Sequence, residues 1–135
     1  MPYPVIDIEG IGPTYAEKLN HLGIKTTGDL LERGRTKKGR EQIAHDTNIP
    51  ESLILTWVNH CDLMRIKGIA AQFAELLEAA GVDSVKEFAH RNAENLHNKL
   101  VETNDKFGLS GRVPSAETLA EMIEQAKTMD PKVSH

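Results

Sequence analysis

Cysteine and aromatic residues are scarce in this chain of 135 residues, and Lys and Arg do not outnumber Asp and Glu. The single cysteine, Cys61, excludes an internal disulfide framework. One Trp, two Tyr and three Phe are too few to assemble base-stacking platforms readily. The formal net charge is −4, whereas proteins that grip a long track of DNA carry an excess of Lys and Arg. Any contact with nucleic acid must therefore come from a local basic patch or be weak.

Long apolar runs and catalytic motifs are also missing. No run approaches the roughly 20 residues that a membrane-spanning helix needs, and the start, MPYPVIDIEG, lacks the layout of a secretory signal. We therefore expect a cytoplasmic protein with no membrane partner. The P-loop, dinucleotide fingerprint, nucleophile elbow and HExxH motifs are absent, and the histidines are scattered. We expect neither an enzyme nor a site for a metal, a cofactor or a small-molecule substrate.

The chain contains an internal repeat with a spacing of 58 residues. The segment IEGIGPTYAEKLNHLGIKTTGDLL, residues 8–31, aligns without a gap over 24 positions with IKGIAAQFAELLEAAGVDSVKEFA, residues 66–89. The identical pairs include Gly10 and Gly68. Self-similarity of this kind indicates that one structural unit occurs twice.

Each copy has the pattern of an apolar-glycine-apolar turn followed by two helices. Gly23 and Gly81 stand where a left-handed cap is expected to end the first helix. The second helix is expected to begin with a capping pair, Thr26–Asp29 in the first copy and Ser84–Glu87 in the second. The apolar residues of the first helix recur at spacings of three and four: Tyr15, Ala16, Leu19 and Leu22, then Phe73, Ala74, Leu77 and Ala80.

Further helices are predicted after each copy, over about 36–46, 50–64, 92–105 and 115–129. The helix over 50–64 is apolar nearly all round, with Trp57 in its middle, which is typical of a buried helix. We expect it to lie centrally, with both halves packed against it. The predicted fold is all-α, with a first half over residues 1–63, a second half over residues 64–135 and a frayed tail after Asp130.

The first turn, GIGPTYAEKL, resembles the hairpin of the helix-hairpin-helix superfamily, whose usual form is apolar-Gly-apolar-Gly followed by Ala and Leu. The whole chain is similar to the bacterial family catalogued as domain of unknown function 4332. The matching stretches are IEGIGPTYAEKL, TKKGREQIA, LTWVNHCDLMRIKGI, ELLEAAGVDSVKEFAHRNAENL and VPSAETLAEMIEQAK. The resemblance implies an all-α fold of tandem, SAM-like hairpin units. It implies no activity.

The first hairpin is a candidate site for the phosphate backbone of a nucleic acid. Gly10 and Gly12 permit backbone angles and close approaches that a side chain would block, with Ile11 between them. The amides from Gly12 to Thr14 and beyond open a helix and can point at a phosphate, and Lys18 lies one turn further on. In the alternative interpretation, the glycines only make the turn. The carboxylates of Asp7 and Glu9, which precede it, disfavour the binding of an anion.

The second hairpin is a weaker candidate. Ala70 replaces its second glycine, and Leu76 takes the place of the lysine. Lys67 and Gly68 are the residues that remain able to contact a phosphate. The more conservative interpretation is a structural turn.

The stretch RGRTKKGR is basic with no acid inside it. Its charged residues are Arg33, Arg35, Lys37, Lys38 and Arg40. Such a cluster can grip a nucleic-acid backbone or an acidic partner, and it can equally be a solvated loop and helix start.

Three functions follow from these patterns. The first is a non-enzymatic module that binds a DNA or RNA backbone independently of sequence. The second is a protein-interaction adaptor in which the hairpins are only corners. The third is an accessory subunit of an enzyme whose chemistry lies elsewhere.

Overall fold

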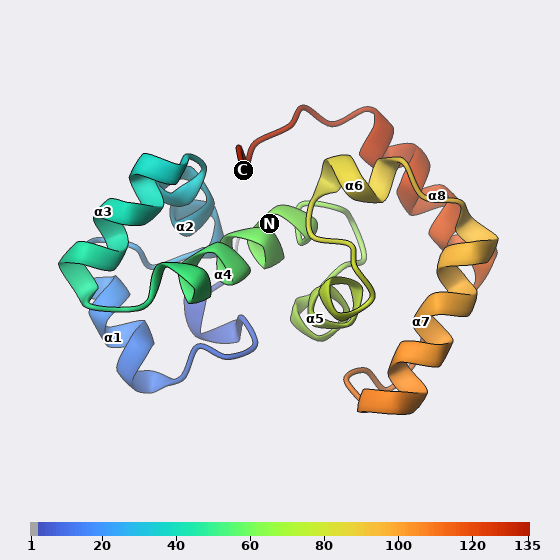
Figure 1. The fold of residues 1–135 in the computed structure, drawn as a ribbon, viewed down its shortest axis with the longest axis horizontal. Helices are drawn as coiled ribbons and strands as arrows, with labels where there is room; N and C mark the ends of the chain where they lie inside the picture. Colours follow the sequence, from blue (N-terminus) through green and yellow to red (C-terminus); the bar gives the residue numbers. More distant parts are fainter. Residues whose placement is uncertain (1–2) are drawn as a thin grey trace. The chain divides into compact units, whose positions relative to one another are not determined.

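The computed structural model describes residues 3–135, and within them the chain is all-helical, as predicted (Figure 1). Two compact units are present. One comprises the chain up to Asp62 together with Lys132–His135, and the other comprises Leu63–Pro131. The elements of the first unit are η1 (Val5–Asp7), α1 (Pro13–His21), α2 (Thr27–Gly34), α3 (Lys37–Thr47) and α4 (Glu51–Leu63), the last ending at the boundary. Those of the second are α5 (Ala71–Ala79), α6 (Val85–Ala89), α7 (Ala93–Phe107) and α8 (Ala116–Lys127).

Side-chain caps determine where several helices begin. At the start of α2 the hydroxyl of Thr26 accepts a hydrogen bond from the amide of Asp29 at 3.1 Å, and the Asp29 carboxylate accepts the amide of Thr26. The predicted capping pair is therefore present. In the second unit the hydroxyl of Ser84 accepts the amide of Glu87 at the start of α6. These bonds satisfy amides that a helix start otherwise leaves without a partner.

The two halves repeat the same turn in backbone detail. Gly10 and Gly68 both have a φ of +93°, a left-handed conformation that a side chain strains. In each half the turn closes with a hydrogen bond three residues back, from the Ile11 amide to the Ile8 carbonyl and from the Ile69 amide to the Ile66 carbonyl, both at 3.1 Å. The internal repeat is thus a repeat of local structure.

The core of the first unit forms around the inner face of α4. Ile54, Trp57, Val58 and Cys61 of this helix are buried among the apolar residues of α1, α2 and α3. The ring of Tyr15 lies against Trp57, with the two centroids 5.3 Å apart. Burial raises the pKa of the Cys61 thiol well above its usual range, so this cysteine stays protonated and unreactive.

The core of the second unit begins at the last residue of α4. Leu63 and Met64 belong to it, together with Phe88 of α6, and the apolar faces of α5, α7 and α8 complete it. Within this unit α8 packs against α6 and α7. The predicted burial of α4 is confirmed, and one helix contributes side chains to two separate cores.

The prediction of a frayed tail after Asp130 is wrong. The amide of Ser134 donates to the carbonyl of Arg35 at 2.8 Å, and Val133 packs against the core of the first unit. The sequence predicts a frayed tail because its residues form no periodic apolar pattern. Its order comes from contacts with residues about 100 positions away, which local propensity does not report.

We predict that Asp29→Ala lowers the free energy of unfolding by about 1 kcal/mol at neutral pH, because the cap of α2 is lost. Hydrogen bonds from the amides of Lys25 and Thr26 lower the pKa of Asp29. The contribution of Asp29 to the free energy of unfolding is therefore complete above the pKa that this carboxyl has in the unfolded chain. It is lost as the pH falls through the lower pKa of the folded protein. Denaturant unfolding should show the difference between wild type and variant shrinking below about pH 4. A difference independent of pH would contradict this assignment.

Candidate nucleic-acid interface

Gly10 is required by both backbone and packing. Its positive φ excludes most side chains, and an added Cβ would lie 3.3 Å from Nε1 of Trp57. Ile11, the next residue, is buried in the core of the first unit. Gly10 and Ile11 therefore fasten the turn to the unit and have structural roles.

Gly12 is different, because neither backbone nor packing requires a glycine. It is the N-cap of α1 in an extended conformation, with φ −91° and ψ −177°, and an added Cβ would meet no atom within 4 Å. The equivalent Ala70 caps α5 with nearly the same angles, φ −106° and ψ −175°. The missing side chain at Gly12 leaves open space in front of a helix start.

The first turn of α1 presents donors to this space. Gly12 provides no side-chain cap, so among the described residues no cap side chain accepts the first amides of α1. Thr14 and Lys18 are exposed, and their spacing of four residues puts them on one face of α1. The positive end of the helix dipole lies at the Gly12 cap, and Lys18, which belongs to the last turn of α1, can add its charge by extending its side chain toward that end. The arrangement can hold an anionic oxygen.

In the second unit the corresponding turn is backed by α8. The amide of Lys67 donates to Oε1 of Gln125 at 3.2 Å, and a Cβ at Gly68 would lie 2.9 Å from Cε of Met122. A shallow hollow of about 340 Å³ beside the turn is lined by Lys67, Gly68, Thr118, Glu121, Met122 and Gln125. Lys67 and Gly68 are exposed, but a main-chain donor is already used, and a carboxylate of α8 lines the hollow. This turn is the poorer anion site.

The basic stretch spans the end of α2 and the start of α3, and the charges of its arginines are partly used within the unit. Nη1 of Arg33 donates to the carbonyl of Leu22 at 2.9 Å and so caps the C-terminal end of α1. Nη1 of Arg35 lies 3.5 Å from the carboxylate of Glu32. Lys37 and Lys38 are exposed on the first turn of α3.

Arg40 does not lie on the basic surface. Its side chain is 2 % exposed and donates to the carbonyls of Gly34 at 2.9 Å and Ser134 at 2.8 Å. Desolvation lowers the pKa of this guanidinium, opposed by the charge of Glu51. We therefore correct the sequence-based assignment and remove Arg40 from the candidate interface. The spacing of Arg40, Ile43 and Thr47, three and four residues apart on the buried face of α3, carried the signal of its burial.

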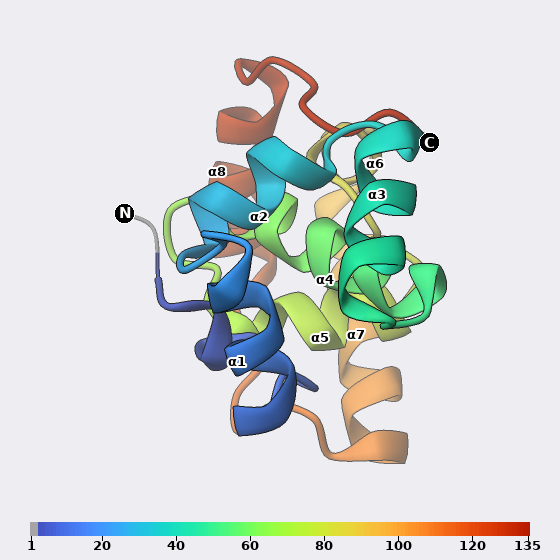
Figure 2. The ribbon, with the colours of Figure 1, turned by 90° about the vertical axis from the view of Figure 1, so that its left-hand side faces the viewer.

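The hairpin and the basic stretch form two separate surfaces. Arg33 binds the C-terminal end of α1, whereas the hairpin amides lie at its N-terminal end. A helix of nine residues separates the two ends by about 13 Å. Figures 1 and 2 show the start of α3 on the opposite side of the first unit from the start of α1.

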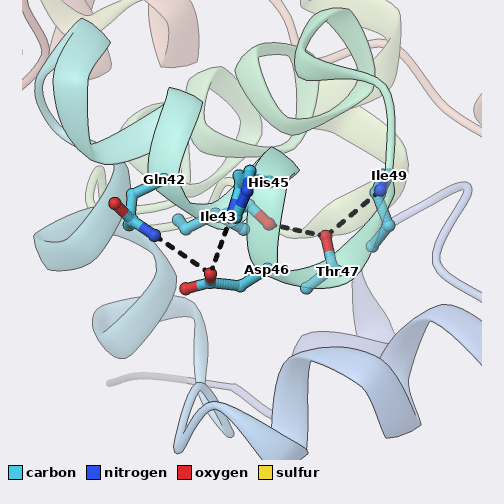
Figure 3. A network of polar contacts seen from close by, with 6 residues as sticks. All are labelled: Gln42, Ile43, His45, Asp46, Thr47 and Ile49. Atoms are coloured by element: carbon cyan, nitrogen blue, oxygen red, sulfur yellow. Dashed lines mark hydrogen bonds and ion pairs between the residues drawn. The ribbon is translucent and has the colours of Figure 1, made fainter.

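A polar network closes α3 at its far end (Figure 3). Nε2 of Gln42 donates to Oδ1 of Asp46 at 3.0 Å, and Nδ1 of His45 lies 3.3 Å from the same oxygen. Both contacts lower the pKa of Asp46. The hydroxyl of Thr47 donates to the carbonyl of Ile43 and accepts the amide of Ile49. This network stabilises the C-terminal end of α3. Residues 3–135 contain no group of three His, Cys, Asp or Glu side chains that could hold a metal ion.

The chain is a helical protein built from two similar units. It belongs to the family described as Domain of unknown function (DUF4332), whose family model matches residues 9–129. No curated protein and no solved structure matches the chain. In the part of the chain from Tyr3 onward, no helix has the length and apolar character needed to cross a membrane.

We predict that two glycine substitutions in the first unit differ in their effect on stability. Gly12→Ala should change the free energy of unfolding by less than about 1 kcal/mol, because its Cβ enters open space. Gly39→Ala should cost roughly 1–3 kcal/mol, because its Cβ would collide with the carbonyl oxygen of Arg33. Thermal and urea unfolding of both variants checks this. Equal losses would mean that the space before Gly12 is filled.

Proposed function

We propose that the protein is a non-enzymatic binding module of the helix-hairpin-helix type that holds the phosphate backbone of DNA independently of base sequence. The contact surface is the start of α1 from Gly12 to Thr14 together with Lys18, and Gly10 and Ile11 hold this surface in place. The observation that carries the proposal is the open space at Gly12, a glycine that the fold does not need.

The physical argument concerns distance and charge. An amide binds a phosphate oxygen at about 2.9 Å, and a side chain at the cap would obstruct that approach. A helix N-terminus offers several such amides together with a favourable dipole. Lys18, on the same face of α1 as Thr14, adds a full positive charge. Main-chain amides recognise phosphate and carry no information about bases, so the binding is independent of sequence.

Charge sets the strength of the interaction. The formal net charge of −4 repels a polyanion at long range, and only a few cations lie near the turn. The affinity should therefore be moderate and sensitive to salt. Lys37 and Lys38 form a second exposed basic surface at the start of α3, available to another phosphate or to an acidic partner.

A protein-interaction adaptor is the second candidate. It is favoured by the second unit, where α8 backs the equivalent turn, uses an amide and places Glu121 beside it. If the turns of both units have the structural role that this turn has, the hairpins only connect helices, and the exposed faces of the helices bind the partner protein.

We predict that the protein binds a duplex of about 20 base pairs at about 50 mM salt, with similar affinity for unrelated sequences and a steep loss as salt rises. Fluorescence anisotropy of a labelled duplex measures this. Lys18→Ala should weaken binding and reduce the slope of log affinity against log salt by about 0.9, because one phosphate contact is lost. Lys67→Ala should leave both unchanged.

A matched pair of substitutions separates the two candidate functions. Gly12→Glu puts a carboxylate at the cap of α1, and Ala70→Glu puts one at the same position of α5. Under our proposal only Gly12→Glu abolishes duplex binding. Loss in both variants would mean that both turns bind DNA. Undiminished binding by Gly12→Glu, or no binding by the wild type at low salt, would favour the adaptor.

Trp57 provides an independent check, because it is the single tryptophan and its Nε1 lies close to Gly10. We expect duplex binding at the first hairpin to change the emission of Trp57. Binding that leaves this emission constant would place the DNA on another surface.

A further inference from the structure

The segment Lys132–His135 is held on the first unit in the manner of a bound peptide. The amide of Ser134 donates to the carbonyl of Arg35 at 2.8 Å, and the carbonyl of Ser134 accepts Nη2 of Arg40 at 2.8 Å. Both main-chain groups of one residue are therefore paired. Main-chain pairing is how protein domains commonly recognise extended segments of other chains.

Side chains on either side of Ser134 add to the contact. Val133 is partly buried against the core of the first unit. Nε2 of His135 lies 2.9 Å from Oδ1 of Asn59, which is itself buried in α4. The hydroxyl of Ser134 makes a longer contact, 3.3 Å, with the carbonyl of Arg35. The first unit thus provides an apolar contact for Val133, two main-chain hydrogen bonds for Ser134 and a polar contact for His135.

The guanidinium of Arg40 is the part of this surface that needs an occupant. It is 2 % exposed, and its hydrogen bonds go to two neutral carbonyls, one at Gly34 and one in the tail. A buried guanidinium that loses an acceptor is strongly destabilised, because its charge is already removed from water. Release of the tail therefore leaves a donor that another carbonyl can satisfy.

We propose that Arg35, Arg40 and Asn59 form a peptide-docking slot, and that Lys132–His135 occupies it as the chain's own built-in ligand. When the tail is released, the slot takes an extended segment of a partner protein with a branched apolar residue followed by a residue with a free amide. The inference does not rest on nucleic-acid binding, since the slot shares no residue with the first hairpin. A tethered tail competes at millimolar effective concentration, so the slot is closed to weak ligands in the resting protein.

The test uses the full chain with one substitution that frees the slot. Ser134→Pro removes the amide that donates to Arg35, and Ser134→Ala retains it as the matched control. A labelled, C-terminally amidated peptide MDPKVSH is titrated into each protein, with MDPKVPH as the control peptide. We expect MDPKVSH to bind Ser134→Pro at least about tenfold more tightly than it binds Ser134→Ala or the wild type. MDPKVPH should bind none of them.

Hydrogen exchange on the wild type keeps the proposal falsifiable if Ser134→Pro does not fold. The Ser134 amide should exchange at least about tenfold more slowly than in the free peptide, and excess MDPKVSH should remove this protection by displacing the tail. Exchange at the free-peptide rate would overturn the proposal. So would a folded Ser134→Pro protein that binds no MDPKVSH, or protection that excess peptide leaves unchanged.

Discussion

The structure depends on one backbone constraint, a glycine turn in the left-handed region that a side chain from a later helix packs against. In the first unit the turn at Gly10 lies against Trp57 of α4, and in the second the turn at Gly68 lies against Met122 of α8. Each contact links a local turn to a distant helix of the same unit. Because the turn also sets the direction of the next helix, it positions both the core face and the helix start that faces outward.

The two units share this constraint but differ in their outward residues. The cap positions Gly12 and Ala70 have the same extended backbone, so the change from glycine to alanine alters only what can approach. The change from Lys18 to the buried Leu76 exchanges a surface charge for core packing. The two units are therefore one fold with two different surfaces. Only the first has a glycine at the helix cap, which leaves the approach to its first amides unobstructed by a cap side chain.

Sequence patterns predict the features that local chemistry controls. The helices, the cap at Thr26 and the turn at Gly68 all follow from spacing and residue type, and the structure has them. The docking of Ser134 did not follow, because it depends on Arg35 and Arg40, which lie more than 90 positions away in the chain. The burial of Arg40 could be suspected from its spacing to Ile43 and Thr47, but its second acceptor, the carbonyl of Ser134, could not. The openness of Gly12 also could not be read from the sequence, because it depends on which atoms of the folded unit stay away from the turn.

Most arginine side chains of this protein are engaged in contacts within their own unit, which limits the contacts that they can make with an anion. Arg33, Arg40, Arg65 and Arg91 each donate to a backbone carbonyl of their own unit, and Arg35 lies beside a carboxylate.

Guanidinium groups engaged in this way are less available for bidentate contacts with guanine edges, the commonest means of reading DNA sequence. Lys18 on α1 and Lys37 and Lys38 on the first turn of α3 are exposed, and lysines attract phosphate as point charges without fixed geometry. The use of these five arginines within their own units therefore agrees with the proposed contact to phosphate, which does not read base sequence.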